Sequence, residues 1–223
     1  MAKQIENFLL GASLFVAVLV VWQLLNIIQM IPAWLLPSPG ETLSAFLRIV
    51  QSGILTELLL NSFLNIFPAF ILSLVISLVL GVFIGTNTIF RRMSMPFLAA
   101  INSVPSLAWL PLIILFLGFT RETIWAVIFI SSFIKMIYGV IGGVRDINYN
   151  WLLVARNLEL NMFETITKVI LPGALPQILN GIRIGFGSAW RSLIGAEMLM
   201  VTAGGLGKYI WMSQWADGGL FQK

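Results

Sequence analysis

The chain has 223 residues, of which 59% are hydrophobic and only 10% are charged. A soluble globular domain has roughly half apolar and about a quarter charged residues, so this composition excludes an ordinary soluble protein and indicates a membrane protein. The net charge of +4 is too small and scattered for a nucleic-acid-binding face, and the sequence contains neither Cys nor His. We therefore expect no disulfide, no metal site, no cofactor bound by the chain and no nucleic-acid partner.

Five apolar stretches are long enough to cross a membrane as helices. A spanning helix needs about 20 mainly apolar residues, because its backbone must satisfy its own hydrogen bonds across about 30 Å of hydrocarbon. The stretches cover residues 8–31, 58–85, 96–117, 124–144 and 177–201. They predict an all-α, polytopic membrane protein with five spans, the first of them a retained N-terminal transmembrane helix within residues 1–35.

Lys and Arg residues in the short loops predict the orientation of these spans. With a cytoplasmic N-terminus, more of the loop cations lie on the cytoplasmic side than outside, and the Arg91-Arg92 pair after the second span contributes most to this bias. We therefore predict a multi-pass protein in a bilayer with its N-terminus in the cytoplasm.

Residues 36–57 are expected to form a short helix between the first two spans. Ser38 and Glu41 have the spacing of a capping box, and Pro39 stands at the first helical position. Apolar residues then recur every three to four positions opposite polar ones. The pattern predicts a periplasmic amphipathic helix, whose simplest role is that of a connector packed on the helix bundle.

Residues 145–176 form a longer polar stretch between the fourth and fifth spans, on the predicted cytoplasmic side. Their periodicity predicts two short helices with an exposed turn near residues 159–161, and it fits a solvated hairpin as well as a docking element. Pro172 and Pro176 are expected to end the loop helix before the fifth span begins, because proline fixes φ and has no N–H to donate.

This stretch resembles the cytoplasmic loop signature of ABC-importer membrane subunits, in which Glu-Ala-Ala is followed four residues later by Gly and then by Ile-x-Leu-Pro. Four residues stand where the signature would place them: Ala155, Val169, Leu171 and Pro172. Three depart from it, with Leu153 at the Glu position, Val154 at the first Ala and Glu159 at the Gly. Residues 36–39, 105–111 and 181–198 are also similar to the permease branch associated with nitrate, sulfonate and taurine uptake.

The resemblance covers about residues 35–216 and implies a type I ABC-importer-like permease bundle over residues 58–216 in the bacterial cytoplasmic (inner) membrane. The implied partners are a second permease copy, a cytoplasmic ABC ATPase dimer and a periplasmic or lipid-anchored solute-binding protein. Because the sequence lacks G-x-x-x-x-G-K-[ST], we expect a non-enzymatic chain whose partner subunit uses ATP. A sixth span is also implied, so either the protein is shortened or its final helix lies outside this sequence.

The resemblance further implies that the loop contacts the ATPase. The residues expected to couple are Leu153, Val154, Ala155, Glu159, Leu160, Asn161, Leu171 and Pro172. A Trp in place of Glu159 or Asn161 is predicted to uncouple ATP hydrolysis from uptake.

Charged and polar residues inside the spans are candidates for a translocation pathway, because a charge in a span costs about 2.5–3.5 kcal/mol on insertion scales and usually faces protein, water or substrate. The candidates are Ser103, Ser106, Trp109, Lys135, Arg191 and Glu197. A positive lining would favour an anion such as nitrate, a sulfonate or taurine. In the alternative interpretation, Glu197 pairs with Arg191 or Lys135, and the third span is a kinked packing helix.

Three G-x-x-x-G pairs, at residues 81–85, 139–143 and 181–185, predict close helix packing within the subunit or at a homodimer contact. Two other classes of function stay open. One is an ion-gradient secondary transporter that uses the intramembrane charges for coupling, and the other is a non-transporting membrane scaffold.

Overall fold

The computed structural model describes residues 2–29, 31–32, 35–200 and 204–215, with side chains from Ser13 to Ser213 within these ranges. Positions 1, 30, 33–34, 201 and 216, which belong to predicted segments, lie outside the described residues. The described chain is all-helical and contains no strand, as the composition predicts. It divides into a unit of residues Leu58–Tyr209 and a second unit built around Met1–Glu57.

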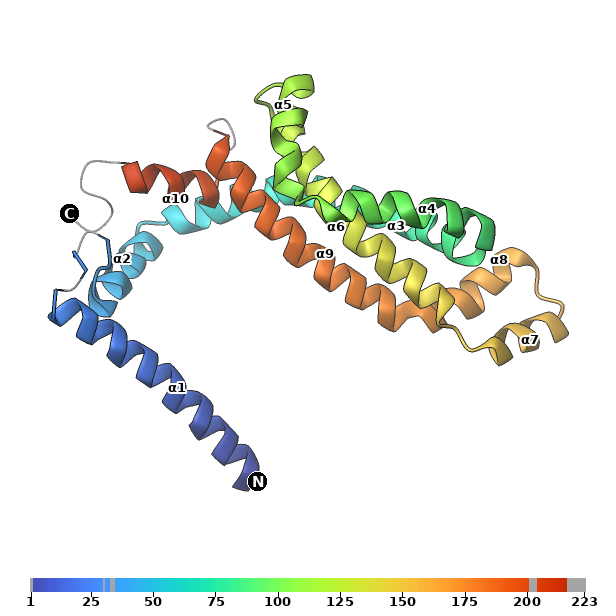
Figure 1. Ribbon diagram of the computed structural model, residues 1–223, viewed down its shortest axis with the longest axis horizontal. Coiled ribbons are helices and arrows are strands. Elements are labelled where there is room, and N and C mark those ends of the chain that lie inside the picture. The colour runs from blue at the N-terminus through green and yellow to red at the C-terminus, as the bar shows by residue number, and fades with distance from the viewer. Residues whose placement is uncertain (1, 30, 33–34, 201–203, 216–223) are drawn as a thin grey trace. The chain divides into compact units, whose positions relative to one another are not determined.

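The second unit contains α1 (Ala2–Ile27) and α2 (Pro39–Gln51). The indole N–H of Trp22 donates to the carbonyl of Pro37 at 2.9 Å, and the side-chain amide of Asn26 donates to the carbonyl of Leu36 at 3.0 Å. The end of α1 therefore holds the chain that leads into α2 (Figure 1).

The capping box predicted for α2 is confirmed. The Glu41 carboxylate accepts from the backbone N–H of Ser38 at 2.8 Å, and the Glu41 N–H donates to the Ser38 hydroxyl at 3.3 Å. Pro39 occupies the first turn, where its missing N–H leaves no helical bond unmade.

Lowering the pH is expected to release this cap. The hydrogen bonds from the backbone and the hydroxyl of Ser38 hold the pKa of Glu41 below its ordinary value. A depressed carboxyl pKa stabilises the fold fully above the unfolded value of about 4.3, and this stabilisation is lost as the pH falls through the lower folded pKa. Hydrogen exchange of the first-turn amides of α2 should therefore accelerate, after correction for intrinsic rates, only below pH of about 4. The same acceleration in Glu41→Gln would contradict this assignment.

The Leu58–Tyr209 unit contains the remaining helices, except for the first residues of α3 and the part of α10 from Ile210 onward, which belong to the other unit. In chain order these are α3 (Ile54–Thr86), α4 (Thr88–Ser103), the 3₁₀ turn η1 (Ser106–Trp109), α5 (Leu110–Leu117), α6 (Arg121–Arg145), α7 (Tyr149–Asn157), α8 (Met162–Glu164), the π-helical segment η2 (Thr165–Ile170), α9 (Leu171–Leu199) and α10 (Leu206–Trp215).

Helices α6 and α9 pack along most of their length and form the centre of this unit (Figure 1). A Cβ added at Gly139 of α6 would lie 2.6 Å from the Cα of Gly181 on α9, so the two backbones touch where only glycine fits. On the other side of α6, a Cβ added at Gly81 of α3 would lie 2.6 Å from the side chain of Val140. The glycine pairs thus mediate packing within the subunit, the first of the two alternatives that the sequence leaves open.

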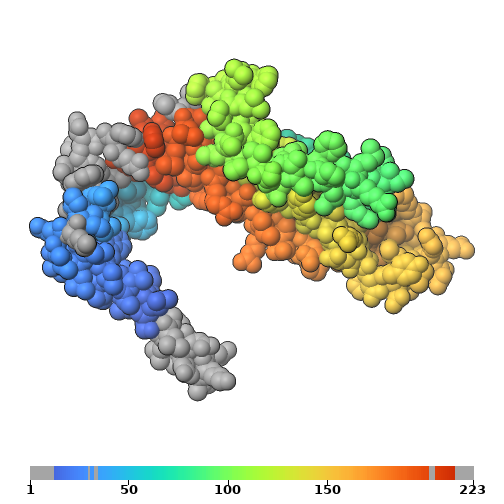
Figure 2. Space-filling view, viewed as in Figure 1, coloured from blue at the N-terminus to red at the C-terminus, as the bar shows by residue number. Residues whose placement is uncertain are grey.

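The third predicted span, residues 96–117, is not one straight helix. Helix α4 ends at Ser103, and the helical stretch Ser106–Leu117 turns away from it by 88° (Figure 1). Val104 precedes Pro105, and the proline ring disfavours the helical conformation for the residue before it, which agrees with the extended backbone of Val104 at ψ 126°. Beyond this break α5 projects from the unit (Figure 2).

The prediction that Pro172 and Pro176 end the loop helix is wrong. Helices α8, η2 and α9 form one continuous helix, Met162–Leu199. A wider π turn lies directly before Pro172, with the N–H of Leu171 bonded to the carbonyl of Ile166. This register change accommodates Pro172 in the first turn of α9, where an α-helical ring-to-carbonyl clash would otherwise break the helix.

Within the described residues, three helices are long and apolar enough to cross a membrane, or four if the bent α4–α5 pair counts as one span. The three are α3, α6 and the continuous helix Met162–Leu199. In α1, the described stretch Ser13–Ile27 is apolar but shorter than a full span. The chain is therefore a multi-pass membrane protein, and the total of five membrane spans stays a prediction.

Candidate functional site

A cavity of about 340 Å³ lies where the break after α4 meets α6 and α9. Its lining comprises Ile101, Asn102, Val104, Pro105, Ser106, Leu107, Ile130, Ser131, Ile134, Lys135, Ser188, Arg191 and Ser192. The break after α4 positions Ser106. The extended Val104 and Pro105 turn the start of η1 toward α9, where Ser106 contacts Ser192. Helical spacing positions the others: Ser131 and Lys135 share one face of α6, and Ser188, Arg191 and Ser192 share one face of α9.

Four serine hydroxyls in this cavity form a continuous hydrogen-bonded chain. Ser106 lies 2.7 Å from Ser192, Ser192 donates to Ser131 at 2.9 Å, and Ser131 lies 2.8 Å from Ser188. Ser131, Ser188 and Ser192 are buried. The chain connects η1, α6 and α9 through side chains that reach from each element into the same space.

Two cationic side chains line the same cavity. The Lys135 ammonium donates to the side-chain oxygen of Asn102 at 2.7 Å, which ties α6 to the last turn of α4. Arg191 lies on α9, one residue before Ser192, and its side chain is exposed. Among the described residues that line the cavity there is no carboxylate, so the site is rich in donors and positive charge.

The structure brings together three of the six residues predicted to line a pathway, namely Ser106, Lys135 and Arg191. The other three lie elsewhere. Ser103 donates to the carbonyl of Ala100 at 2.7 Å and is exposed, while Trp109 and Glu197 do not line the cavity. Asn102, Ser131, Ser188 and Ser192 were not among the predicted residues. Helical spacing could have indicated two of them, because Ser188 lies three residues before Arg191 and Ser131 four residues before Lys135.

Glu197 is fully buried and holds the C-terminal part of α9 against α3 and the start of α10. The hydroxyl of Ser62 lies 3.0 and 3.1 Å from its two carboxylate oxygens, the amide of Asn65 donates at 3.0 Å, and the backbone N–H of Gly207 donates at 3.0 Å. The Ser62 oxygen also accepts from the N–H of Leu206 at 3.0 Å. In the described chain the one ion pair is Lys168–Glu164, so the alternative in which Glu197 pairs with Arg191 or Lys135 is wrong.

The predicted helical hairpin between α6 and α9 is confirmed. It consists of α7 and α8 with an exposed turn between them, at one end of the unit (Figures 1 and 2). Three apolar side chains at this turn, which we name the loop tip, are strongly exposed: Leu158 by 66%, Met162 by 71% and Phe163 by 74%. Large apolar groups at the end of a polar hairpin indicate a surface that a partner covers.

The turn itself has the geometry that glycine prefers. Glu159 adopts a left-handed conformation with φ 54°. The N–H of Leu160 bonds to the carbonyl of Ala155 at 3.1 Å and the N–H of Glu159 to that of Arg156 at 3.0 Å, which is the Schellman pattern of a helix end. Position 159 is where the loop signature has Gly, so the structure explains the requirement at this position, and this chain meets it with Glu.

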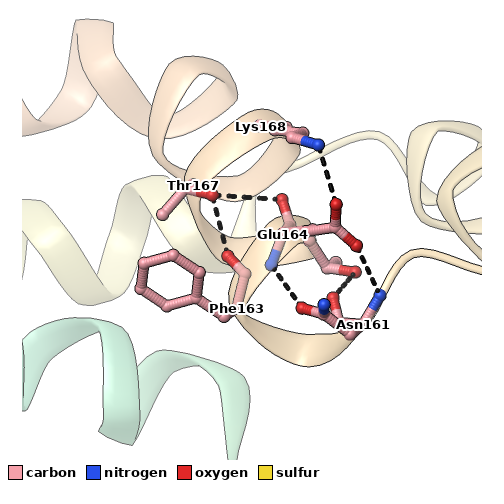
Figure 3. A network of polar contacts seen from close by, with 6 residues as sticks. Asn161, Phe163, Glu164, Thr167 and Lys168 are labelled. Atoms are coloured by element: carbon pink, nitrogen blue, oxygen red, sulfur yellow. Dashed lines mark hydrogen bonds and ion pairs between the residues drawn. The ribbon is translucent and has the colours of Figure 1, made fainter.

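A second capping box begins α8 directly after this turn (Figure 3). The Asn161 side chain accepts from the N–H of Glu164 at 2.9 Å, and the Glu164 carboxylate accepts from the N–H of Asn161 at 3.1 Å and from Lys168 at 2.8 Å. The hydroxyl of Thr167 donates to the carbonyl of Phe163 at 2.8 Å. These bonds hold the loop tip in a defined shape at the start of the long helix.

The eight predicted coupling residues do not share one surface. Glu159 and Asn161 lie at the turn, Val154 is exposed on α7, and Ala155 is buried. The remaining four are Leu153 (exposed on α7), Leu160 (half-buried in the turn), Leu171 (half-buried in α9) and Pro172 (exposed in α9). The three exposed apolar residues of the loop tip are not among these eight residues.

Comparison with known proteins supports an assignment to a family. Residues 73–217, which include the cavity and the hairpin, match the model of the family described as binding-protein-dependent transport system inner membrane component. The chain is 32% identical to the aliphatic sulfonates transport permease protein SsuC of Bacillus subtilis over 200 residues, which are 90% of this chain and 72% of that protein.

Two further relatives have related names. The taurine transport system permease protein TauC of Escherichia coli is 28% identical over 87% of this chain and 73% of its own length. The bicarbonate transport system permease protein CmpB of Synechococcus elongatus is 32% identical over 59% of this chain and 47% of its own length. With the family match, the membrane helices and the hairpin, these similarities show that the chain belongs to the binding-protein-dependent transport system inner membrane components, as an ABC transporter permease.

Proposed function

We propose that this permease imports a small anion through the cavity between α4, α6 and α9, driven by ATP that a separate subunit hydrolyses. The observation that carries the anion assignment is the donor-rich lining, in which Lys135 and Arg191 have no carboxylate beside them among the described lining residues. The names of the relatives support it, because sulfonates, taurine and bicarbonate all carry an anionic oxygen group.

The proposed partners follow from the family. A cytoplasmic ABC ATPase dimer would supply the energy, a second copy of the permease would complete the pathway, and a periplasmic or lipid-anchored binding protein would deliver the solute. In this arrangement the N-terminus and the α7–α8 hairpin face the cytoplasm of a bacterium whose inner membrane holds the complex.

The loop tip is the proposed contact with the ATPase. Leu158, Met162 and Phe163 present an apolar surface that a groove on the partner can cover. The capping box of Asn161 and Glu164 fixes this surface to the start of the helix that continues to Leu199. Movement of the ATPase would thus act on a helix that also carries Arg191 and the buried serines.

Uptake by the reconstituted complex tests the proposal. The complex is purified through a tag on this chain, placed in vesicles with its binding protein, and supplied with labelled taurine, ethanesulfonate or bicarbonate. We expect uptake of at least one of these solutes to require ATP and to survive ionophores that collapse ion gradients. Uptake that needs a gradient instead would support a secondary transporter, and no flux with every partner present would support a scaffold.

Removing the apolar groups of the loop tip is expected to separate the permease from its ATPase. The double change of Met162 and Phe163 to Ser should reduce ATP-dependent uptake about tenfold or more, because apolar anchors at an interface contribute about 2 kcal/mol or more each. Co-purification of the ATPase measures the contact directly. Phe97→Ser, which removes an equally exposed aromatic from α4, is the matched control.

The structure also explains why these variants test the loop better than a Trp at Asn161. Asn161 caps α8, so its replacement removes a structural hydrogen bond as well as altering the surface. If the double variant keeps both its ATPase and its uptake, the loop tip is not the contact.

A further inference from the structure

The side chains that line the cavity have more free hydrogen-bond donors than free acceptors. Each serine hydroxyl has one proton to donate. Ser192 donates its proton to Ser131, so the bond between Ser106 and Ser192 must be donated by Ser106. The bond between Ser131 and Ser188 uses one of their two protons, which leaves the other available to a guest in the cavity.

The cations add further donors. An ammonium group has three N–H bonds, of which Lys135 directs one to Asn102. A guanidinium has five, and within the described part of the chain Arg191 has no hydrogen bond or ion pair to another residue. The cavity therefore offers an ammonium, a planar guanidinium and a hydroxyl proton, and its side chains have more free donors than free acceptors.

We propose that this cavity is a binding site for the oxyanion head of the transported solute, a sulfonate or carbonate type of group, and that the permease therefore selects its substrate in addition to the external binding protein. The proposal rests on the proposed function and deepens it. A guanidinium binds two oxygens of such a group at once, and charge-assisted hydrogen bonds are about twice as strong as neutral ones. At about 340 Å³ the cavity has room for a small solute of this class.

Asn102 gives a test that preserves shape. Asn102→Asp keeps the size of the side chain and its bond to Lys135, but it places a carboxylate against the ammonium. The lining then has one net positive charge less, and an incoming anion meets a like charge. Arg191→Gln removes the second cation, Arg191→Lys retains the charge without the planar fork, and Arg183→Gln removes an exposed cation from the same helix outside the cavity.

Binding is measured on the purified permease–ATPase complex, without binding protein or nucleotide, from the rise in apparent melting temperature with added ethanesulfonate, bicarbonate or ethylammonium. A ligand of the folded state raises this temperature according to its concentration relative to its Kd. We expect ethanesulfonate or bicarbonate to stabilise the wild type and Arg183→Gln, and ethylammonium to have no effect. Asn102→Asp and Arg191→Gln should weaken anion binding about tenfold or more, and Arg191→Lys less.

Three outcomes would overturn the site: no anion shift in the wild type at millimolar concentration, anion shifts in both Asn102→Asp and Arg191→Gln that equal the shift of the wild type, or a shift with ethylammonium that equals the shift with the anions. If one variant fails to fold, the other still decides, because each lowers the net positive charge of the lining through a change on a different helix. The proposed function is judged separately. If the wild type shows ATP-dependent uptake and both variants keep its rate and selectivity, the proposed function is supported and the anion site is contradicted. If the wild type shows no ATP-dependent uptake, the proposed function itself is contradicted.

Discussion

Glu197→Ala is expected to lower the free energy of unfolding by about 3–5 kcal/mol, because it leaves several buried donors without their acceptor. The hydroxyl of Ser62, the amide of Asn65 and the N–H of Gly207 all point at this carboxylate. At about 2–4 °C per kcal/mol for a chain of this size, the apparent Tm of the purified protein in detergent should fall by roughly 10 °C. The contacts between α9, α3 and α10 should weaken together.

Two variants control this prediction. Glu197→Gln keeps one acceptor oxygen but turns a donor toward the remaining partners, so its Tm should lie between those of the wild type and the alanine variant. Glu122→Ala removes an exposed carboxylate from the first turn of α6 and should lower stability by no more than about 1 kcal/mol. A Tm of Glu197→Ala equal to that of Glu122→Ala would show that the buried carboxylate does not hold these helices together.

Gly139→Ala is expected to destabilise the protein by about 2 kcal/mol, because its new methyl group would meet a backbone that cannot move aside. The added Cβ would lie 2.6 Å from the Cα of Gly181 and 3.1 Å from the carbonyl oxygen of Gln177. Helices α6 and α9 must separate to accept it, and overpacking of this kind costs about 1–3 kcal/mol. Loss of the monodisperse species on heating in detergent measures the effect.

Gly142→Ala is the matched control in the same helix. A Cβ at this position has no atom within 4 Å, so it adds helix propensity without a clash and should leave the protein as stable or stabilise it by about 0.5–1 kcal/mol. Equal stability of the two variants would mean that α6 and α9 do not pack this closely.

Composition and periodicity predicted the helical class, the α2 cap and the hairpin, because each depends on neighbours in the chain. The two wrong predictions of helix course, a straight third span and an end of the loop helix before the fifth span, both lie at prolines. The residues around Pro105 indicate a breaker but not an 88° turn, since the direction of the chain after a break depends on tertiary packing. At Pro172 the same residue type does not break the helix, because a π turn before it relieves the clash.

The candidate site was predictable only in part for a related reason. Lys135 and Arg191 could be singled out because a charge in an apolar helix needs a partner or water. The serines that complete the cavity are common in membrane helices, and only the packing of α6 on α9 places Ser131 beside Ser192. Glu197 shows the same limit, since its partner Ser62 lies far away in the sequence, on α3.

The helix from Met162 to Leu199 joins the α7–α8 hairpin to the rest of the unit without a linker. At about 1.5 Å per residue, its 38 residues follow a path of roughly 57 Å, whose direction changes near the π-helical segment before α9 (Figure 1). A displacement of the loop tip would therefore reach the α9 turn that holds Glu197 through continuous helical backbone.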